Sequence, residues 1–141
     1  MFFMATVYRF EDLEIWQPTR KLYQQVSKLA EKLKKNHDYR FAEQMKAAIG
    51  SVMDNIAEGF ERNIRLEFLN SLRIAKGECG ELRSQFYRCL DNKYVTQQEF
   101  GEYCEEVDKV SKKIATFVKY LNNSKIKGLK FKGRLNINDK Q

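Results

Sequence analysis

Residues 65–92, RLEFLNSLRIAKGECGELRSQFYRCLDN, carry a regular hydrophobic pattern near the middle of this 141-residue chain. Apolar side chains recur there at intervals of three and four residues, the spacing of one face of an α-helix. They are Phe68, Leu72, Ala75, Cys79, Leu82, Phe86 and Cys89. Gly77 and Gly80 interrupt this helix, and they either let another backbone come close or mark a kink. The stretch therefore predicts a long amphipathic helix.

Three other segments show the same periodicity, at about 11–35, 39–61 and 96–122. In the first, Pro18 lacks an N–H, so the helix either kinks there or restarts with Pro18 in its first turn. The last begins at a capping box, in which Thr96 and Glu99 satisfy each other's backbone N–H groups. The sequence thus predicts four long helices.

Connections of about three to six residues join these helices, which makes consecutive helices antiparallel neighbours. We therefore expect an all-α fold, an antiparallel up-down-up-down four-helix bundle over residues 11–122. An N-terminal arm (1–10) precedes the bundle and an extended basic tail (123–141) follows it.

The helix at 39–61 is apolar around much of its circumference, so it is either central in the bundle or buries a second face against another copy. The oligomer-interface candidates are Ile49, Met53, Ala57 and Phe60.

The tail alternates with a period of two, as in an extended segment. Its cationic candidates for nucleic-acid binding are Lys130, Lys132 and Arg134. Residues 123–141 hold six Lys+Arg and one Asp, a net charge of +5, whereas residues 1–122 hold 20 Lys+Arg and 18 Asp+Glu, a net charge of +2. A basic tail suits nucleic-acid contact or simply aids solubility. A membrane-surface role for its apolar face is a further alternative. That face comprises Leu129, Phe131, Leu135 and Ile137.

The helix at 65–92 also carries a basic face. Arginine and lysine side chains in a row suit a phosphate backbone, and Tyr87 could stack on a base. The candidates are Arg73, Lys76 and Arg83, with Arg62 and Arg65 at the preceding turn. The alternative is a solvated helix face whose cations pair locally with Glu78 and Glu81.

The sequence has few of the residue types that commonly form enzyme active sites. His37 is the only histidine and falls in a predicted turn, so a metal site or a histidine-dependent catalytic dyad is not expected. The three cysteines are expected to be small core residues of a reducing compartment. With no signal peptide or membrane span in the sequence, we predict a cytoplasmic, non-enzymatic protein without cofactor or metal.

Three motifs together resemble a known family. They are Phe10-Glu11-Asp12-Leu13-Glu14-Ile15-Trp16-Gln17, Asn55-Ile56-Ala57-Glu58-Gly59-Phe60, and Ile74-Ala75-Lys76-Gly77-Glu78-Cys79-Gly80-Glu81-Leu82 preceded by Glu67-Phe68-Leu69. Over residues 8–121 the chain resembles the bacterial bundle proteins encoded in intervening sequences of large-subunit ribosomal RNA genes. That family is similar to the accessory variability determinant of diversity-generating retroelements.

The resemblance implies a ring-like homopentamer. In the retroelement relatives it further implies a basic surface for RNA or DNA and a reverse transcriptase as protein partner. We therefore expect an oligomeric bundle that binds structured nucleic acid, RNA favoured, without strong sequence readout. The alternative is a scaffold for a protein partner. In the Asn-Ile-Ala-Glu-Gly motif, Asn55 and Glu58 either form part of a site or satisfy backbone groups where Gly59, in a left-handed conformation, ends its helix.

Overall fold

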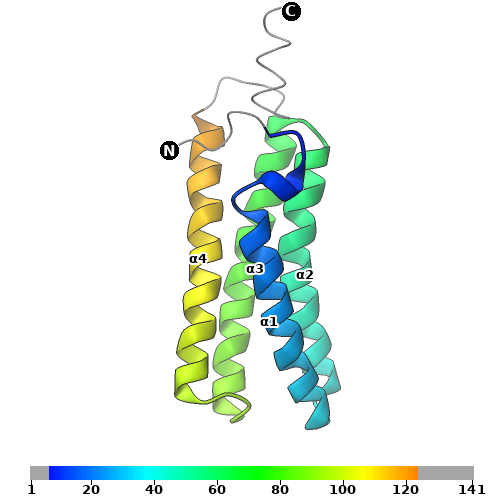
Figure 1. Ribbon diagram of the computed structural model, residues 1–141, viewed down its shortest axis with the longest axis vertical. Helices are drawn as coiled ribbons and strands as arrows, with labels where there is room; N and C mark the ends of the chain where they lie inside the picture. Colours follow the sequence, from blue (N-terminus) through cyan, green and yellow to red (C-terminus); the bar gives the residue numbers. More distant parts are fainter. Residues whose placement is uncertain (1–6, 124–141) are drawn as a thin grey trace, which may run out of the picture.

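The computed structural model describes residues 7–123, which form four long helices and one short 3₁₀ turn. The elements are η1 (Phe10–Asp12), α1 (Trp16–Lys35), α2 (Tyr39–Glu61), α3 (Arg65–Asp91) and α4 (Gln97–Asn122). The helices run alternately down and up, so each is antiparallel to the next (Figure 1). The all-α up-down-up-down bundle expected from the sequence is confirmed, while the expectations for residues 124–141 lie outside the described residues.

The helix ends follow from local chemistry. Pro18 is the third residue of α1, where no intrahelical N–H is needed, so the helix restarts after η1 and does not kink. At the start of α4, Thr96 Oγ1 accepts from the Glu99 N–H at 3.1 Å and Glu99 Oε1 accepts from the Thr96 N–H at 2.8 Å. The predicted capping box is confirmed.

Three helices end with a non-glycine residue in the left-handed region. His37, Asn63 and Lys93 have φ angles of 64°, 59° and 63° and follow α1, α2 and α3 respectively. After α1, the Asp38 N–H reaches back to the Leu33 carbonyl and the His37 N–H to that of Lys34. These bonds satisfy carbonyls that the helix end would otherwise leave unpaired.

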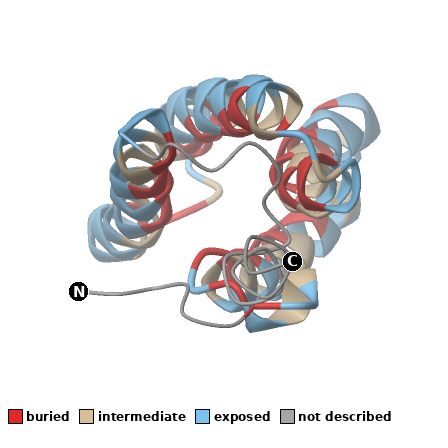
Figure 2. Ribbon diagram, turned by 90° about the horizontal axis from the view of Figure 1, so that it is seen from above, coloured by how far each residue is buried: buried red, intermediate tan, exposed pale blue. Residues whose placement is uncertain are grey.

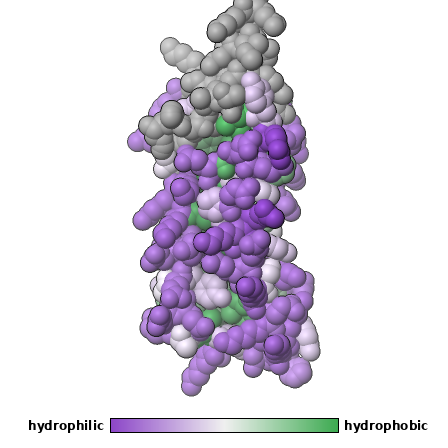
Figure 3. Space-filling view, viewed as in Figure 1, coloured by the Kyte–Doolittle hydropathy of each residue, from purple (hydrophilic) through white to green (hydrophobic). Residues whose placement is uncertain are grey.

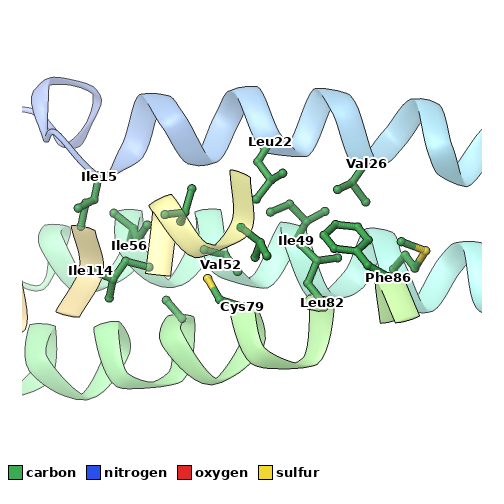
Figure 4. Close-up of a cluster of buried hydrophobic side chains, with 14 of the residues drawn as sticks. Ile15, Leu22, Val26, Ile49, Val52, Ile56, Cys79, Leu82, Phe86 and Ile114 are labelled. Atoms are coloured by element: carbon green, nitrogen blue, oxygen red, sulfur yellow. The ribbon is translucent and has the colours of Figure 1, made fainter. Parts of the chain in front are cut away.

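The apolar stripes of all four helices face one shared interior (Figure 2). The side chains shown in Figure 4 come from every helix of the bundle and meet in a single cluster. They include Leu22 and Val26 of α1, Ile49, Val52 and Ile56 of α2, Cys79, Leu82 and Phe86 of α3, and Ile114 of α4. Burial of this apolar surface is the main stabilising force of the fold.

Helix α2 packs along both α1 and α3, which accounts for its broad apolar surface. Gly59 marks the closest approach. A Cβ built on it would lie 2.7 Å from Ser71 Cβ and 2.9 Å from Phe68 Cδ1, so only glycine fits between α2 and α3. The expectation that Gly59 ends its helix in a left-handed conformation is wrong, because α2 continues to Glu61 and Asn63 takes that conformation.

The Asn55 side chain forms its hydrogen bonds within its own helix, α2. Its Nδ2 donates to the Ser51 carbonyl at 2.8 Å and to Ser51 Oγ at 3.0 Å, one turn earlier in α2. Glu58 is exposed. The Asn-Ile-Ala-Glu-Gly motif is therefore explained by helix packing, through Gly59, rather than by bonds from Asn55 at the helix end.

Candidate nucleic-acid interface

The basic face predicted on α3 is on the surface. Arg73, Lys76 and Arg83 are all exposed, and so is Gly80 between them. Within residues 7–123, Arg73 and Lys76 form no ion pair, so both charges are available to a ligand.

The other α3-side cations are already engaged. Arg83 Nη1 lies 2.9 Å from Asp108 Oδ1 of α4, and Arg62 Nη1 lies 3.1 Å from Glu67 Oε1. Arg65 Nη1 donates to the Leu121 carbonyl at 3.4 Å, at the negative C-terminal end of α4. Exposed pairs of this kind contribute roughly 0–1 kcal/mol each to stability. Their main consequence here is to lower the free positive charge of α3.

The alternative, in which these cations pair locally with Glu78 and Glu81, differs from the pairing in the structure. Glu81 Oε2 accepts from Gln85 Nε2 at 3.2 Å. Partial burial, together with the hydrogen bond to Glu78, raises the pKa of Glu81. The two carboxyl groups thus interact with each other and with Gln85, while Arg83 reaches across to α4.

The charge of the bundle is segregated by helix. Helix α1 holds six Lys+Arg and one Glu, a net charge of +5, whereas α2 holds two cationic and four acidic residues, a net charge of −2. Helices α3 and α4 carry net charges of +1 and −1. The most cationic helix is therefore α1, which the sequence analysis missed, although counting charges over each predicted helix would have found it.

The exposed charges of α1 lie on its outer side. They are Arg20, Lys21, Lys28, Glu31, Lys32 and Lys35. The face of the molecule that carries α1 is largely hydrophilic, with small apolar areas between (Figure 3). Lys34, by contrast, is half-buried and bridges Glu31 and Glu43 at 3.5 and 3.1 Å.

A cavity of about 180 Å³ lies between α1 and α4. Its lining residues are Gln25, Glu99, Glu102, Tyr103 and Glu106. The hydrogen bond from the Thr96 backbone N–H lowers the pKa of Glu99, which keeps that carboxylate charged. Three carboxylates on α4 thus face the cationic helix, yet no ion pair within residues 7–123 joins α1 to α4.

The proposed oligomer interface needs a correction. Ile49 and Phe60 are fully buried in the core of the single chain, so their side chains are not available to a second copy. Both were assigned from sequence because α2 is apolar on several sides, but α1 and α3 cover those sides. Met53 and Ala57 remain partly exposed, and their role in an interface stays a prediction.

The described residues offer little material for catalysis. Between residues 7 and 123 there is no group of three or more His, Cys, Asp or Glu residues that could hold a metal ion. His37 is exposed in its turn, with Nδ1 3.2 Å from the Tyr39 hydroxyl. Cys79 and Cys89 are buried free thiols, and burial raises the pKa of each to about 12. Such thiols are poor nucleophiles.

None of the helices between residues 7 and 123 is long and apolar enough to cross a membrane.

Fold and surface together define a small helical bundle with one strongly cationic helix. The sequence profile of the 23S rRNA-intervening sequence protein family matches residues 11–116, and the chain belongs to that family. No curated protein sequence matches it.

A crystal structure has a similar fold, that of a protein of unknown function from the S23 ribosomal protein family of Bacteroides thetaiotaomicron VPI-5482. The TM-score is 0.71 at 18% sequence identity, and the similarity covers 74% of this chain and 95% of that chain.

Proposed function

We propose that this protein is a non-enzymatic, oligomeric helical bundle that binds structured nucleic acid, with RNA favoured, through electrostatic contacts to phosphates. The observation that carries the proposal is the segregation of charge, which concentrates a net charge of +5 on α1 of a bundle whose other helices are nearly neutral or acidic. Concentrated lysine and arginine attract a phosphate backbone without reading its sequence. The link of the family to ribosomal RNA genes favours RNA as the ligand.

The resemblance to the retroelement accessory determinant favours assembly as a homopentamer. A cytoplasmic location in a bacterium stays a prediction. Met53 and Ala57, on the exposed margin of α2, are the remaining candidates for contact between copies. Exposed Arg73 and Lys76 of α3 would add to the basic surface of each subunit.

The test is light scattering and RNA binding on the same purified protein. A stable RNA hairpin at 50 mM and at 300 mM salt is the probe. Phosphate contacts release counterions, so the affinity should fall steeply with salt, with a slope of about −0.9 per phosphate contact on a logarithmic plot for B-form DNA. A defined oligomer that binds at neither salt concentration contradicts the RNA proposal.

A second candidate function is a scaffold for a protein partner such as a reverse transcriptase. It is favoured by large apolar side chains on the surface around α3, where Ile64, Leu66 and Ile74 are 49%, 62% and 54% exposed. Exposed apolar residues of this size are typical of protein contacts when they gather in one patch. Affinity for such a partner should change far less with salt than affinity for RNA.

A further inference from the structure

The exposed lysines of α1 form a row along the helix. Lys21, Lys28, Lys32 and Lys35 are separated by seven, four and three residues, intervals that return to the same side of an α-helix. At 1.5 Å per residue, their Cα atoms span about 21 Å along the axis. In B-form DNA each strand places a phosphate about every 3.4 Å along the axis, so the row is long enough to contact several phosphates.

Within residues 7–123 these four charges have no direct ion pair, although Lys32 is close enough to Glu99 of α4 for its charge to help lower the pKa of that carboxyl. The one acidic residue of α1, Glu31, lies 3.5 Å from Lys34 instead. Exposed Gln24 on the same side adds hydrogen-bond donors that suit phosphate or sugar oxygens.

The row lacks the aromatic residues that single-strand binding uses. Proteins that hold single strands stack the bases on exposed aromatic rings. On α1 the two aromatic side chains, Trp16 and Tyr23, are partly buried and pack against the core. A straight row of cations without stacking rings suits a rigid phosphate backbone whose bases are already paired.

We infer that the lysine row of α1, Lys21, Lys28, Lys32 and Lys35, binds the sugar–phosphate backbone of double-helical RNA. The inference rests on the proposed function and names the helix and the form of nucleic acid that serve it. It places the main contact on α1, whereas the sequence analysis assigned it to the basic face of α3 and to the basic tail.

The carboxylates of α4 restrict where the duplex lies. Glu99, Glu102 and Glu106 line the cavity on the α4 side of α1 and repel phosphates from it. The duplex therefore contacts α1 from the solvent side rather than entering the seam between the two helices.

The test compares two triple variants with the same net charge. The first is Lys21→Gln/Lys28→Gln/Lys32→Gln on α1. The second, the control, is Lys112→Gln/Lys113→Gln/Lys119→Gln on α4, where all three lysines are exposed. Each variant lowers the formal charge of +7 by three. Circular dichroism and light scattering establish that both keep the fold and the oligomeric state of the wild type.

Each protein is titrated with a perfectly paired RNA hairpin and with oligouridine, between 50 and 300 mM salt. The α1 variant should bind the hairpin about 100-fold more weakly near 0.1 M salt and lose roughly two to three units of the salt slope. The α4 variant should stay within a few-fold of the wild type. Wild-type protein should prefer the hairpin to oligouridine.

The outcomes separate this inference from the proposed function. Equal losses in both triple variants overturn the α1 row, since net charge alone would then govern binding. A preference for oligouridine overturns the duplex assignment. If wild-type protein binds neither probe at 50 mM salt, the proposed function itself fails.

Discussion

Replacing Gly59 by alanine should destabilise the bundle, although alanine is the better helix former. A Cβ at this position meets Ser71 Cβ at 2.7 Å and Phe68 Cδ1 at 2.9 Å. The Phe68 ring cannot easily move away, because it packs edge-on against Phe60 and Phe117 with centroid distances of 6.0 and 5.5 Å. Helices α2 and α3 must therefore separate locally to admit the methyl group.

The magnitude follows from two opposing terms. Overpacking a core contact costs about 1–3 kcal/mol, while glycine to alanine inside a helix gains about 1 kcal/mol. We expect Gly59→Ala to lower the free energy of unfolding by about 1–2 kcal/mol against the wild type. Urea denaturation followed by circular dichroism measures this difference.

The matched control is Gly101→Ala in α4. Gly101 is exposed and its added Cβ meets nothing within 4 Å, so this change should stabilise by about 0.5–1 kcal/mol. Adding Ser71→Gly to the Gly59→Ala variant removes the shortest contact and should give a favourable coupling energy in a double-mutant cycle. If Gly59→Ala gained as much stability as Gly101→Ala, the close approach of α2 and α3 would be refuted.

Three further changes test other parts of the fold. Lys93→Gly should stabilise by about 1 kcal/mol in thermal or urea unfolding, because Lys93 holds a φ of 63° that glycine adopts without strain. Thr96→Ala should lose about 1 kcal/mol by removing the cap of α4, and an unchanged unfolding midpoint would contradict that role. In the folded protein at pH 8, a thiol reagent should modify the partly exposed Cys104 first and leave Cys79 and Cys89 unreacted until denaturant is added. Burial raises the folded-state pKa of Cys79 and Cys89 to about 12 from an ordinary value of 9.0, so their contribution to stability is complete below about pH 9 and declines as the pH rises toward 12.

Much of the fold was predictable because its signals are local. The bounds expected for α2 agree with the structure, and α3 ends one residue before the expected Asn92. Hydrophobic spacing and the Thr96–Glu99 capping box depend on residues within one or two turns, so sequence alone determines them. Short connections then determine the antiparallel order, since they leave the chain no room for another path.

The errors arose where a residue depends on its neighbours in space. Ile49 and Phe60 looked like interface residues because the apolar pattern of α2 does not show which helices pack against it. In the structure α1 and α3 bury both side chains. Gly59 looked like a helix end because glycine often ends helices, yet it is required by the approach of α3. In both cases a contact distant in sequence determines the role.

The candidate site, too, was predictable from sequence only in its local features. The sequence by itself determined the number of helices, most of their ends and the total charge of +7, because these depend on composition and local spacing. The start of the first helix was wrong, since α1 begins at Trp16 and not near Glu11. Only the tertiary structure decided which charges remain free. It joins Arg83 to Asp108 across 25 residues of sequence, whereas Lys21, Lys28, Lys32 and Lys35 of α1 stay exposed and without an ion pair in the described chain. Ion pairs between helices depend on which helix faces meet. The hydrophobic periodicity of a single helix does not show which faces these are.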